Sequence, residues 1–259
     1  MKQFHATLGL KSGVGIEADL IAKWTTDTAE VDLIVSLQTV KHPQYRNGVI
    51  QVIDVVRCGI LGAWLVMPKY TPLQSLSQMS PKEYHYLGLQ IVEAVAFLHA
   101  ERIAHRDLKP ANIVVDLKQE LSATRVYIID FGNARRCASE YRCKGFQGTR
   151  GWTAPEVQDG VSWEPMSAYI WAMAKILLHF AALAGTPDQK MSNVVACREP
   201  SSRPSAASLF NALHPPLPRP TKRHQVSAEL LRAKFQAMAD KVRTQFGDEY
   251  SNGGVHPYT

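Results

Sequence analysis

One short stretch of the chain brings an acidic, a basic and an amide side chain close together. Asp107, Lys109 and Asn112 lie in the segment His-Arg-Asp-Leu-Lys-Pro-Ala-Asn, and Asp130 follows in Asp-Phe-Gly. A carboxylate within hydrogen-bond reach of a hydroxyl can accept its proton, typically accelerating a reaction by about 10²–10⁴-fold. Oxygen ligands suit Mg²⁺, which usually binds only a few protein atoms and takes its remaining ligands from phosphate and water. These residue types favour transfer of a phosphoryl group to a hydroxyl.

Each of these side chains has a separate part in such a transfer, which depends on placing the phosphates, neutralising their charge and accepting the proton of the hydroxyl. We assign Asp107 as the proton acceptor. Lys109 lies two residues further on, and in an extended segment this spacing puts both side chains on one side. Its ammonium can therefore steady the transferring phosphate. Asn112 and Asp130 are the predicted Mg²⁺ ligands.

Two kinds of element must hold these residues in place. Residues 80–100 are typical of a capped helix, with a capping box formed by Ser80 and Glu83. Residues 113–115 and 126–129 are rich in β-branched side chains and predict two short strands. These strands bring the two predicted metal ligands together.

A third motif, Ala-Pro-Glu at residues 154–156, completes the set. The three motifs resemble the catalytic loop, the metal-binding loop and the end of the activation segment of eukaryotic-type protein kinases. The resemblance implies an α+β fold, the two-lobe protein kinase-like fold, with a truncated β-rich small lobe and a mainly helical large lobe. It also implies a protein serine/threonine kinase that uses ATP and Mg²⁺ and acts on a protein substrate. By the same resemblance, the Thr149 hydroxyl would contact Asp107 and Lys109.

The domain organisation follows from this resemblance. We place a kinase-like domain at residues 1–214, with its small lobe at 1–68 and its large lobe at 71–214. Residues 215–259 are then a Pro-rich basic linker followed by an amphipathic helix. That helix either docks on the large lobe or binds a partner or a membrane surface.

The front of the chain is the least regular part of the resemblance. Kinases of this type open with a Gly-rich loop over the ATP phosphates, followed by a strand that bears a lysine. Residues 8–11 resemble that strand, which makes Lys11 the lysine that pairs with Glu30 and positions ATP. In this register the Gly-rich loop is absent. The chain is then either a fragment of a longer product or a kinase that has lost the loop.

A rival register takes Lys23 as the strand lysine and Gly9, Gly13 and Gly15 as a degenerate phosphate loop. We disfavour it because few residues remain between Lys23 and the turn after the next helix, around His42, to hold the helix that carries the paired glutamate. The glycines also depart from the family's order, and a partial glycine pattern is weak support.

Residues 65–70 resemble the last strand of the small lobe and the hinge that binds adenine. The resemblance makes Met67 the gatekeeper of the adenine pocket. Pro68 has no backbone N–H, so the amide of Lys69 or of Tyr70 is the expected donor to adenine.

Residues 168–185 form an almost unbroken apolar run. Its length is near the roughly 20 residues that cross a membrane. Lys175 and His179 interrupt the run, however, and charged or ionisable side chains are rare in membrane spans. We therefore prefer the central buried helix of the kinase large lobe, which follows the Ala-Pro-Glu motif in the family.

Two positions of the large lobe bear on how firmly the site is held. The family begins the central helix with an aspartate that braces the catalytic loop, but Tyr169 stands here, and a phenol cannot accept several hydrogen bonds as a carboxylate does. Further on, Glu156 and Arg203 match residues that form a buried ion pair in the family.

Composition, net charge and cysteine spacing limit which classes of protein and which locations are consistent with the chain. The chain has 259 residues, a formal net charge of +6 and a globular composition. No interleaving of basic and aromatic residues gives a clear nucleic-acid signal, and no clear membrane signal stands out. The four cysteines lack metal-ligand spacing and no signal peptide pattern is present, which favours an intracellular protein of the cytoplasm or nucleus.

Two functions stay open at this stage. The intact Asp107, Lys109, Asn112 and Asp130 favour an active kinase. The missing Gly-rich loop and Tyr169 favour a catalytically impaired, pseudokinase-like binding or scaffold module. The segment between Asp130 and Glu156 is also basic, and we interpret it either as a solvated loop or as one ordered by a phosphate.

Overall fold

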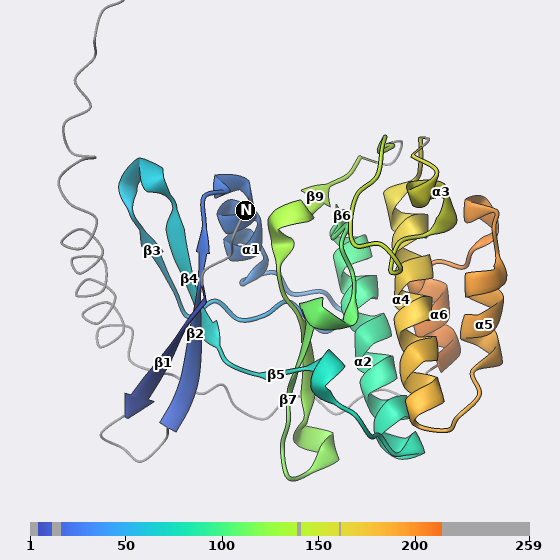
Figure 1. Ribbon diagram of the computed structural model, residues 1–259, viewed down its shortest axis with the longest axis horizontal. Helices are drawn as coiled ribbons and strands as arrows, with labels where there is room; N and C mark the ends of the chain where they lie inside the picture. Colours follow the sequence, from blue (N-terminus) through green and yellow to red (C-terminus); the bar gives the residue numbers. More distant parts are fainter. Residues whose placement is uncertain (1–4, 12–16, 139–140, 161, 214–259) are drawn as a thin grey trace, which may run out of the picture. The chain divides into compact units, whose positions relative to one another are not determined.

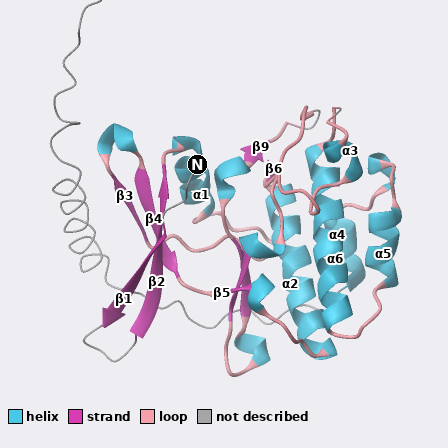
Figure 2. Cartoon of the chain, viewed as in Figure 1, coloured by secondary structure: helices cyan, strands magenta, loops and turns pink. Residues whose placement is uncertain are grey.

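The computed structural model describes residues 5–11, 17–138, 141–160 and 162–213 (Figure 1). The chain divides into two compact units. The described part of the first comes from Met1–Val31 and Val52–Lys69, and that of the second from Asp32–Gln51 and Tyr70–Thr221. One unit is β-rich and the other is mainly helical (Figure 2), so the predicted α+β class is confirmed.

The first unit contains a four-stranded antiparallel sheet with the order β1-β2-β4-β3. The register places Trp24 opposite Trp64, and the two rings meet edge-on with centroids 5.1 Å apart. Such a cross-strand aromatic pair stabilises one register over its neighbours. Because side chains alternate along a strand, Lys23 points to the opposite face from Trp24. The strands are β1 (His5–Lys11), β2 (Glu17–Thr25), β3 (Asp54–Arg57) and β4 (Ala63–Pro68).

Helix α1 (Thr28–Leu37) follows β2 after a short turn. The Asp27 carboxylate accepts hydrogen bonds from the amides two and three residues further on, at 2.9 and 3.3 Å, and so caps the helix. Val31, Ile34 and Leu37 are buried at helical spacing. The cap therefore sets where the helix begins, and it places Glu30 in the first turn.

Residues 32–51 group with the larger unit, whereas the sequence predicts one boundary near residues 68–71. The reason is a set of long-range backbone hydrogen bonds. The Ile50 amide donates to the carbonyl of Ile128 at 3.0 Å, and the Ile128 amide donates to the carbonyl of Gly48 at 2.7 Å. Gly48 is needed here, because a Cβ atom would lie 2.3 Å from the side chain of Ala94.

The second unit is built around helices α2 and α4, which pack against each other. Helix α2 begins with the predicted capping box, since the Ser80 side chain accepts from the Glu83 amide and the Glu83 carboxylate accepts from the Ser80 amide. Small sheets with the orders β5-β7-β8 and β6-β9 complete the unit. Its elements are α2 (Pro81–Ala100), α3 (Pro155–Gln158), α4 (Pro165–Leu183), α5 (Gln189–Ala196), α6 (Ala206–Leu213), β5 (Thr71–Pro72), β6 (Ile103–Ala104), β7 (Ile113–Asp116), β8 (Arg125–Ile128) and β9 (Arg135–Arg136).

Helix α4 is the one helix in the described part of the chain that is long and apolar enough to cross a membrane. In its most apolar window, 61% is buried inside the protein. Tyr169, Met173 and Leu177 are among its buried residues. This burial is typical of a core helix and supports the central large-lobe helix that the sequence favours. The predicted linker and C-terminal helix at residues 215–259 lie outside the described residues.

Candidate active site

The backbone that precedes Asp107 is held in an unusual conformation. Arg106 has a φ of 63°, a value that residues other than glycine adopt rarely. Its Nε donates to the carbonyl of Asn133 at 2.6 Å. The adjacent His105 is buried, and its Nε2 lies 2.8 Å from the carbonyl oxygen of Ile129. These contacts join the catalytic loop to the segment after β8 and direct the Asp107 side chain.

Asp107, Lys109 and Thr149 form a triangle of hydrogen bonds. The Lys109 Nζ donates to Asp107 Oδ2 at 2.8 Å and to Thr149 Oγ1 at 2.8 Å. Thr149 Oγ1 in turn donates to Asp107 Oδ1 at 2.7 Å. The predicted contacts of Thr149 with both residues are thereby confirmed. Asp107 is only 8% exposed, so its carboxylate is held in a largely dry setting with charge-assisted bonds to each oxygen.

Gly148 makes this triangle possible, and the sequence reasoning missed it. Its φ is 99°, in the region that favours glycine. A Cβ atom at this position would lie 2.8 Å from the Arg106 carbonyl oxygen and 2.9 Å from Thr153 Cγ2. A glycine directly before Thr149 therefore lets the activation segment approach the catalytic loop closely. The Gly-Thr pair in the sequence is the signal that points to it.

Asn112 and Asp130 lie on segments that neighbouring strands bring together. Ile113 pairs with Ile128 in the β7–β8 register, and the Ile129 amide donates to the carbonyl of Asn112 at 2.9 Å. The Asn112 Nδ2 donates to the carbonyl oxygen of Asp107 at 2.8 Å. With its nitrogen anchored, the amide presents its Oδ1 as a free oxygen donor. One amide oxygen and one carboxylate fit the few protein ligands that Mg²⁺ takes.

The structure corrects the assignment of the strand lysine. Lys23, on β2, donates to Glu30 Oε1 at 2.5 Å, and the side chains are 6% and 3% exposed. Glu30 is thus the paired glutamate, as the resemblance implies, but its partner is Lys23 and not Lys11. Lys11 lies at the end of β1. The rival register is right about the lysine because α1 is only ten residues long and fits between Lys23 and the following turn.

The same pair shows which strands of the kinase sheet are present. In protein kinases the phosphate-binding lysine lies on the third strand, after the Gly-rich loop. Lys23 lies on the second strand of the described sheet, so β1 and β2 match the second and third family strands. Gly13 and Gly15 lie in sequence between β1 and β2, and therefore after the position of the Gly-rich loop. Those two glycines lie outside the described residues.

The hinge residues differ in whether their backbone amides are available to bind adenine. The Lys69 amide donates to the Asp19 carbonyl at 2.8 Å and continues the β2–β4 pairing. This bond removes Lys69 as the expected amide donor to adenine. Tyr70 follows, and its ring stacks on Tyr127 with centroids 5.3 Å apart. Met67, the predicted gatekeeper, is buried at the end of β4.

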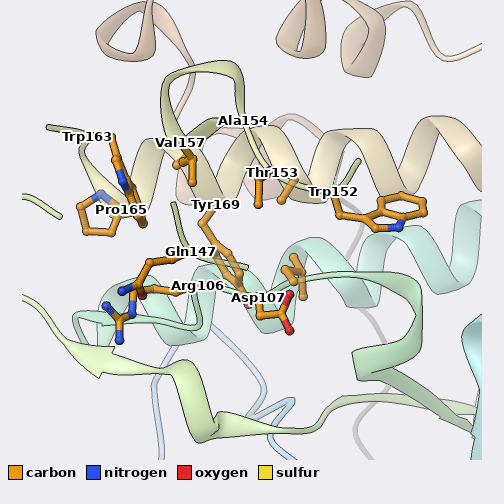
Figure 3. Close-up of a pocket in the computed structure, with 13 residues that line it drawn as sticks. Arg106, Asp107, Gln147, Trp152, Thr153, Ala154, Val157, Trp163, Pro165 and Tyr169 are labelled. Atoms are coloured by element: carbon orange, nitrogen blue, oxygen red, sulfur yellow. The ribbon is translucent and has the colours of Figure 1, made fainter. Parts of the chain in front are cut away.

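Tyr169 occupies the space beneath the catalytic loop. Figure 3 shows its ring extending from α4 toward Arg106 and Asp107, in a hollow that these residues line. The hydroxyl is buried and has no hydrogen-bond partner within the described residues. Burial, followed by the charge of Asp107, raises the pKa of Tyr169 well above its usual value. The phenol is therefore neutral and makes none of the bonds of the family's aspartate.

Rings replace those hydrogen bonds around Tyr169. Its ring stacks on that of His105 at 6.1 Å between centroids and lies 5.4 Å from that of His99. Phe131, of the Asp-Phe-Gly motif, meets the His105 ring edge-on, with 5.0 Å between centroids. The catalytic loop is thus supported by packing at the point where the family uses a carboxylate.

The end of the activation segment is anchored as predicted. Arg203 makes a bidentate ion pair with Glu156, with distances of 2.6 and 2.9 Å. The Arg203 side chain is 0% exposed and also donates to the carbonyls of Ser167 and Cys197. The pair holds α3 against the start of α4 and so fixes the segment that carries Thr149.

Comparison with known proteins agrees with this geometry. A family model described as the protein kinase domain matches residues 28–199. The chain is similar to mitogen-activated protein kinase 12 of Danio rerio, with 32% identity over 58% of this chain and 41% of that protein. It is also similar to mitogen-activated protein kinase 13 of Homo sapiens (36% identity, 47% and 33% covered) and death-associated protein kinase 2 of Mus musculus (29%, 64% and 46%). The chain therefore spans less than half the length of these relatives.

Proposed function

The chain belongs to the protein kinase family, and we propose that it transfers the γ-phosphate of ATP to a serine or threonine hydroxyl of a protein substrate. The observation that carries this proposal is the triangle of Asp107, Lys109 and Thr149, with its three bonds of 2.7–2.8 Å. A triangle of this kind holds a carboxylate and an ammonium where a hydroxyl and a phosphate would meet. A further similar protein, the serine/threonine-protein kinase ksp1 of Schizosaccharomyces pombe (33% identical over 45% of this chain), supports the same chemistry.

Asp107 accepts the proton of the substrate hydroxyl in this proposal. Its Oδ1 accepts one hydrogen bond, from Thr149, and a carboxylate oxygen can accept a second. A substrate hydroxyl bonded there is oriented for attack, and its proton passes to Asp107. Lys109 stays bonded to Oδ2 and can reach the oxygens of the transferring phosphate. Asp107 and Lys109 thus divide proton transfer and charge stabilisation between them.

Each part of the nucleotide has a proposed set of binding residues. Lys23, positioned by Glu30, binds its phosphates. Asn112 Oδ1 and the Asp130 carboxylate hold Mg²⁺, which when bound neutralises charge on the phosphate oxygens. The Tyr70 amide donates to adenine, because the Lys69 amide is used in the sheet.

A second candidate is a pseudokinase-like module that binds partners without transferring phosphate. Tyr169 favours it, since its hydroxyl gives the catalytic loop no hydrogen bond. The complete hydrogen-bonded triangle at Asp107 favours the enzyme. We further propose an intracellular location, because the cysteines in the described residues are free thiols, as reducing compartments keep them.

The test is transfer of labelled γ-phosphate from Mg²⁺-ATP to the chain itself and to a mixture of proteins. We expect transfer by the natural chain and a fall of about 10²-fold or more in Asp107→Asn, which keeps the shape but loses the basic oxygen. Asp130→Asn is the control for the metal site. A folded natural chain that transfers no more label than both variants would overturn the kinase and leave the scaffold.

A further inference from the structure

We propose that the preferred substrate is an acidic peptide segment, selected by a basic rim beside Asp107. The inference rests on the proposed function and names the substrate class of the same site. The rim is defined as the exposed cationic side chains of the activation segment: Arg135, Arg136, Arg142, Lys144 and Arg150.

One part of the rim lies on β9. Arg135 and Arg136 pair with Ala104 and Ile103 of β6, and both side chains are exposed. Strand β6 runs directly into the catalytic loop, so these two guanidinium groups lie on a strand bonded to the residues just before Asp107. Figure 1 shows β6 and β9 at the same end of the unit.

The other part follows the activation segment to Thr149. Arg150 is the next residue after Thr149, whose hydroxyl is bonded to Asp107. Its guanidinium lies over the ring of Phe146, 5.2 Å from the centroid, and that ring is itself 40% exposed. An aromatic ring that holds a guanidinium in place reduces the entropy lost when an acidic group binds it. Arg150 is therefore prepared for a carboxylate next to the acceptor hydroxyl.

The contacts of the rim arginines in the described part of the chain are with neutral groups. Arg135 and Arg136 donate to backbone carbonyls, and Arg136 also donates to the Ser36 hydroxyl. Arg142 donates to the carbonyl and hydroxyl of Ser162. No ion pair to a carboxylate is formed by these residues within the described ranges, so their charge is available to a bound partner.

Three carboxylates of the catalytic loop and activation segment region are already engaged. Asp107 is bonded to Lys109 and Thr149, and Glu156 forms its bidentate pair with Arg203. Glu164 caps α4 by accepting from the first amides of that helix. The rim presents five exposed cationic side chains, which attract a negatively charged segment and repel a basic one.

Exposed charges of this kind act mainly on encounter and binding and are screened by salt. The expected signature is a difference in KM more than in kcat. An acidic peptide should exceed its neutral counterpart in kcat/KM by about 10-fold at low salt, since several weak pairs of a few-fold each combine. The basic counterpart should be the poorest substrate of the three.

The experiment uses the full chain and three serine peptides that differ only in their flanking residues, which are acidic, neutral or basic. Steady-state kinetics at low and high salt give kcat and KM separately. The double variant Arg150→Glu/Lys144→Glu should abolish or invert the preference. Lys82→Glu/Lys190→Glu is the matched control, because it makes the same change in net charge at exposed lysines of α2 and α5, outside the catalytic loop and activation segment, and the preference should persist there.

The outcomes separate the two proposals. Transfer that favours the acidic peptide, and that loses this preference in the rim variant alone, supports the inference. Equal transfer to all three peptides, or a preference for the basic one, overturns the acidic substrate class and leaves the kinase intact. Tight binding of the acidic peptide without preferential transfer also overturns it, because the rim then binds polyanions without directing them to Asp107. Absence of transfer to every peptide, at the level of Asp107→Asn, overturns the proposed function itself.

Discussion

Two regions of the molecule bury polar atoms, and they do so differently. One is the Lys23–Glu30 pair. The other is the ring cluster beneath the catalytic loop, defined as His99, His105 and Tyr169. In the pair, a charge meets its opposite at 2.5 Å, and both side chains are almost fully buried. In the ring cluster, the Tyr169 hydroxyl and His99 Nε2 are buried with no hydrogen-bond partner within the described residues. The first site is charged and paired, whereas the second holds neutral polar atoms.

This difference decides how each region responds to change. A buried ion pair is destabilised strongly when one partner is removed, because the other charge is left in a medium that solvates it poorly. A neutral, unbonded polar atom already carries its desolvation cost in the folded protein, so its removal costs little. Adding a charge to the ring cluster, in contrast, should be costly.

The largest effect is expected from breaking the pair. Lys23→Met leaves the Glu30 carboxylate buried and unpaired, and we expect a loss of about 3–5 kcal/mol in the free energy of unfolding. Binding of ATP should weaken at the same time, because the phosphates lose their lysine. Chemical denaturation and nucleotide titration measure the two effects.

Lys11→Met is the matched control, since it removes the same charge from β1. Because Lys23 is the lysine paired with Glu30, Lys11→Met should leave ATP affinity unchanged. A fall in ATP affinity in Lys11→Met, with Lys23→Met unaffected, would restore the register that the structure rejects. The double variant Lys23→Met/Glu30→Leu should be more stable than Lys23→Met alone.

A smaller effect is expected from placing a charge in the ring cluster. Burial lowers the pKa of His99 to about 4 from an ordinary value of 6.5. Between these pH values, His99 binds a proton in the unfolded chain but not in the folded chain. The contribution of neutral His99 to the free energy of unfolding is therefore fully present above pH 6.5. It is lost as the pH drops toward 4, by about 3 kcal/mol in total.

Urea denaturation of the natural chain and of His99→Phe at several pH values measures this loss. The phenylalanine variant keeps a ring beside Tyr169 and has no proton to gain, so its stability should fall less steeply over the same interval. Parallel curves for the two proteins would show that acid acts elsewhere and that the cluster tolerates the charge.

The two regions also differ in how far the sequence reveals them. Asp107, Lys109 and Asn112 stand in one short segment whose order matches the family motif, so their roles can be assigned from the sequence. Lys23 is one lysine on a short strand, and its assignment depends on the length of α1, which is shorter than the sequence reasoning required. Glu30 can be assigned from the sequence because residues 28–34 resemble the family helix whose glutamate pairs with the strand lysine.

The fold shows the same division. The capping box of α2, the strands β7 and β8 and the buried central helix follow from residue patterns that are local. The grouping of residues 32–51 with the larger unit does not, because it depends on backbone bonds to β8 that no periodicity reveals. Gly148 is intermediate, since only the contact of its backbone with Arg106 shows why glycine is required.

The smallest effect, and the sharpest test of the ring cluster, is expected from Tyr169→Phe. The substitution removes a hydroxyl that has no partner and keeps the ring that stacks on His105. The free energy of unfolding should stay within about 1 kcal/mol of the natural value, and the change should be neutral or stabilising. Phosphoryl transfer should also be unchanged.

Tyr169→Ala, which removes the ring as well, should cost about 3–5 kcal/mol through the cavity it leaves. If Tyr169→Phe lost transfer while remaining stable, the hydroxyl would be bonded to the catalytic loop during the reaction, and the support beneath Asp107 would then be polar, as in the rest of the family.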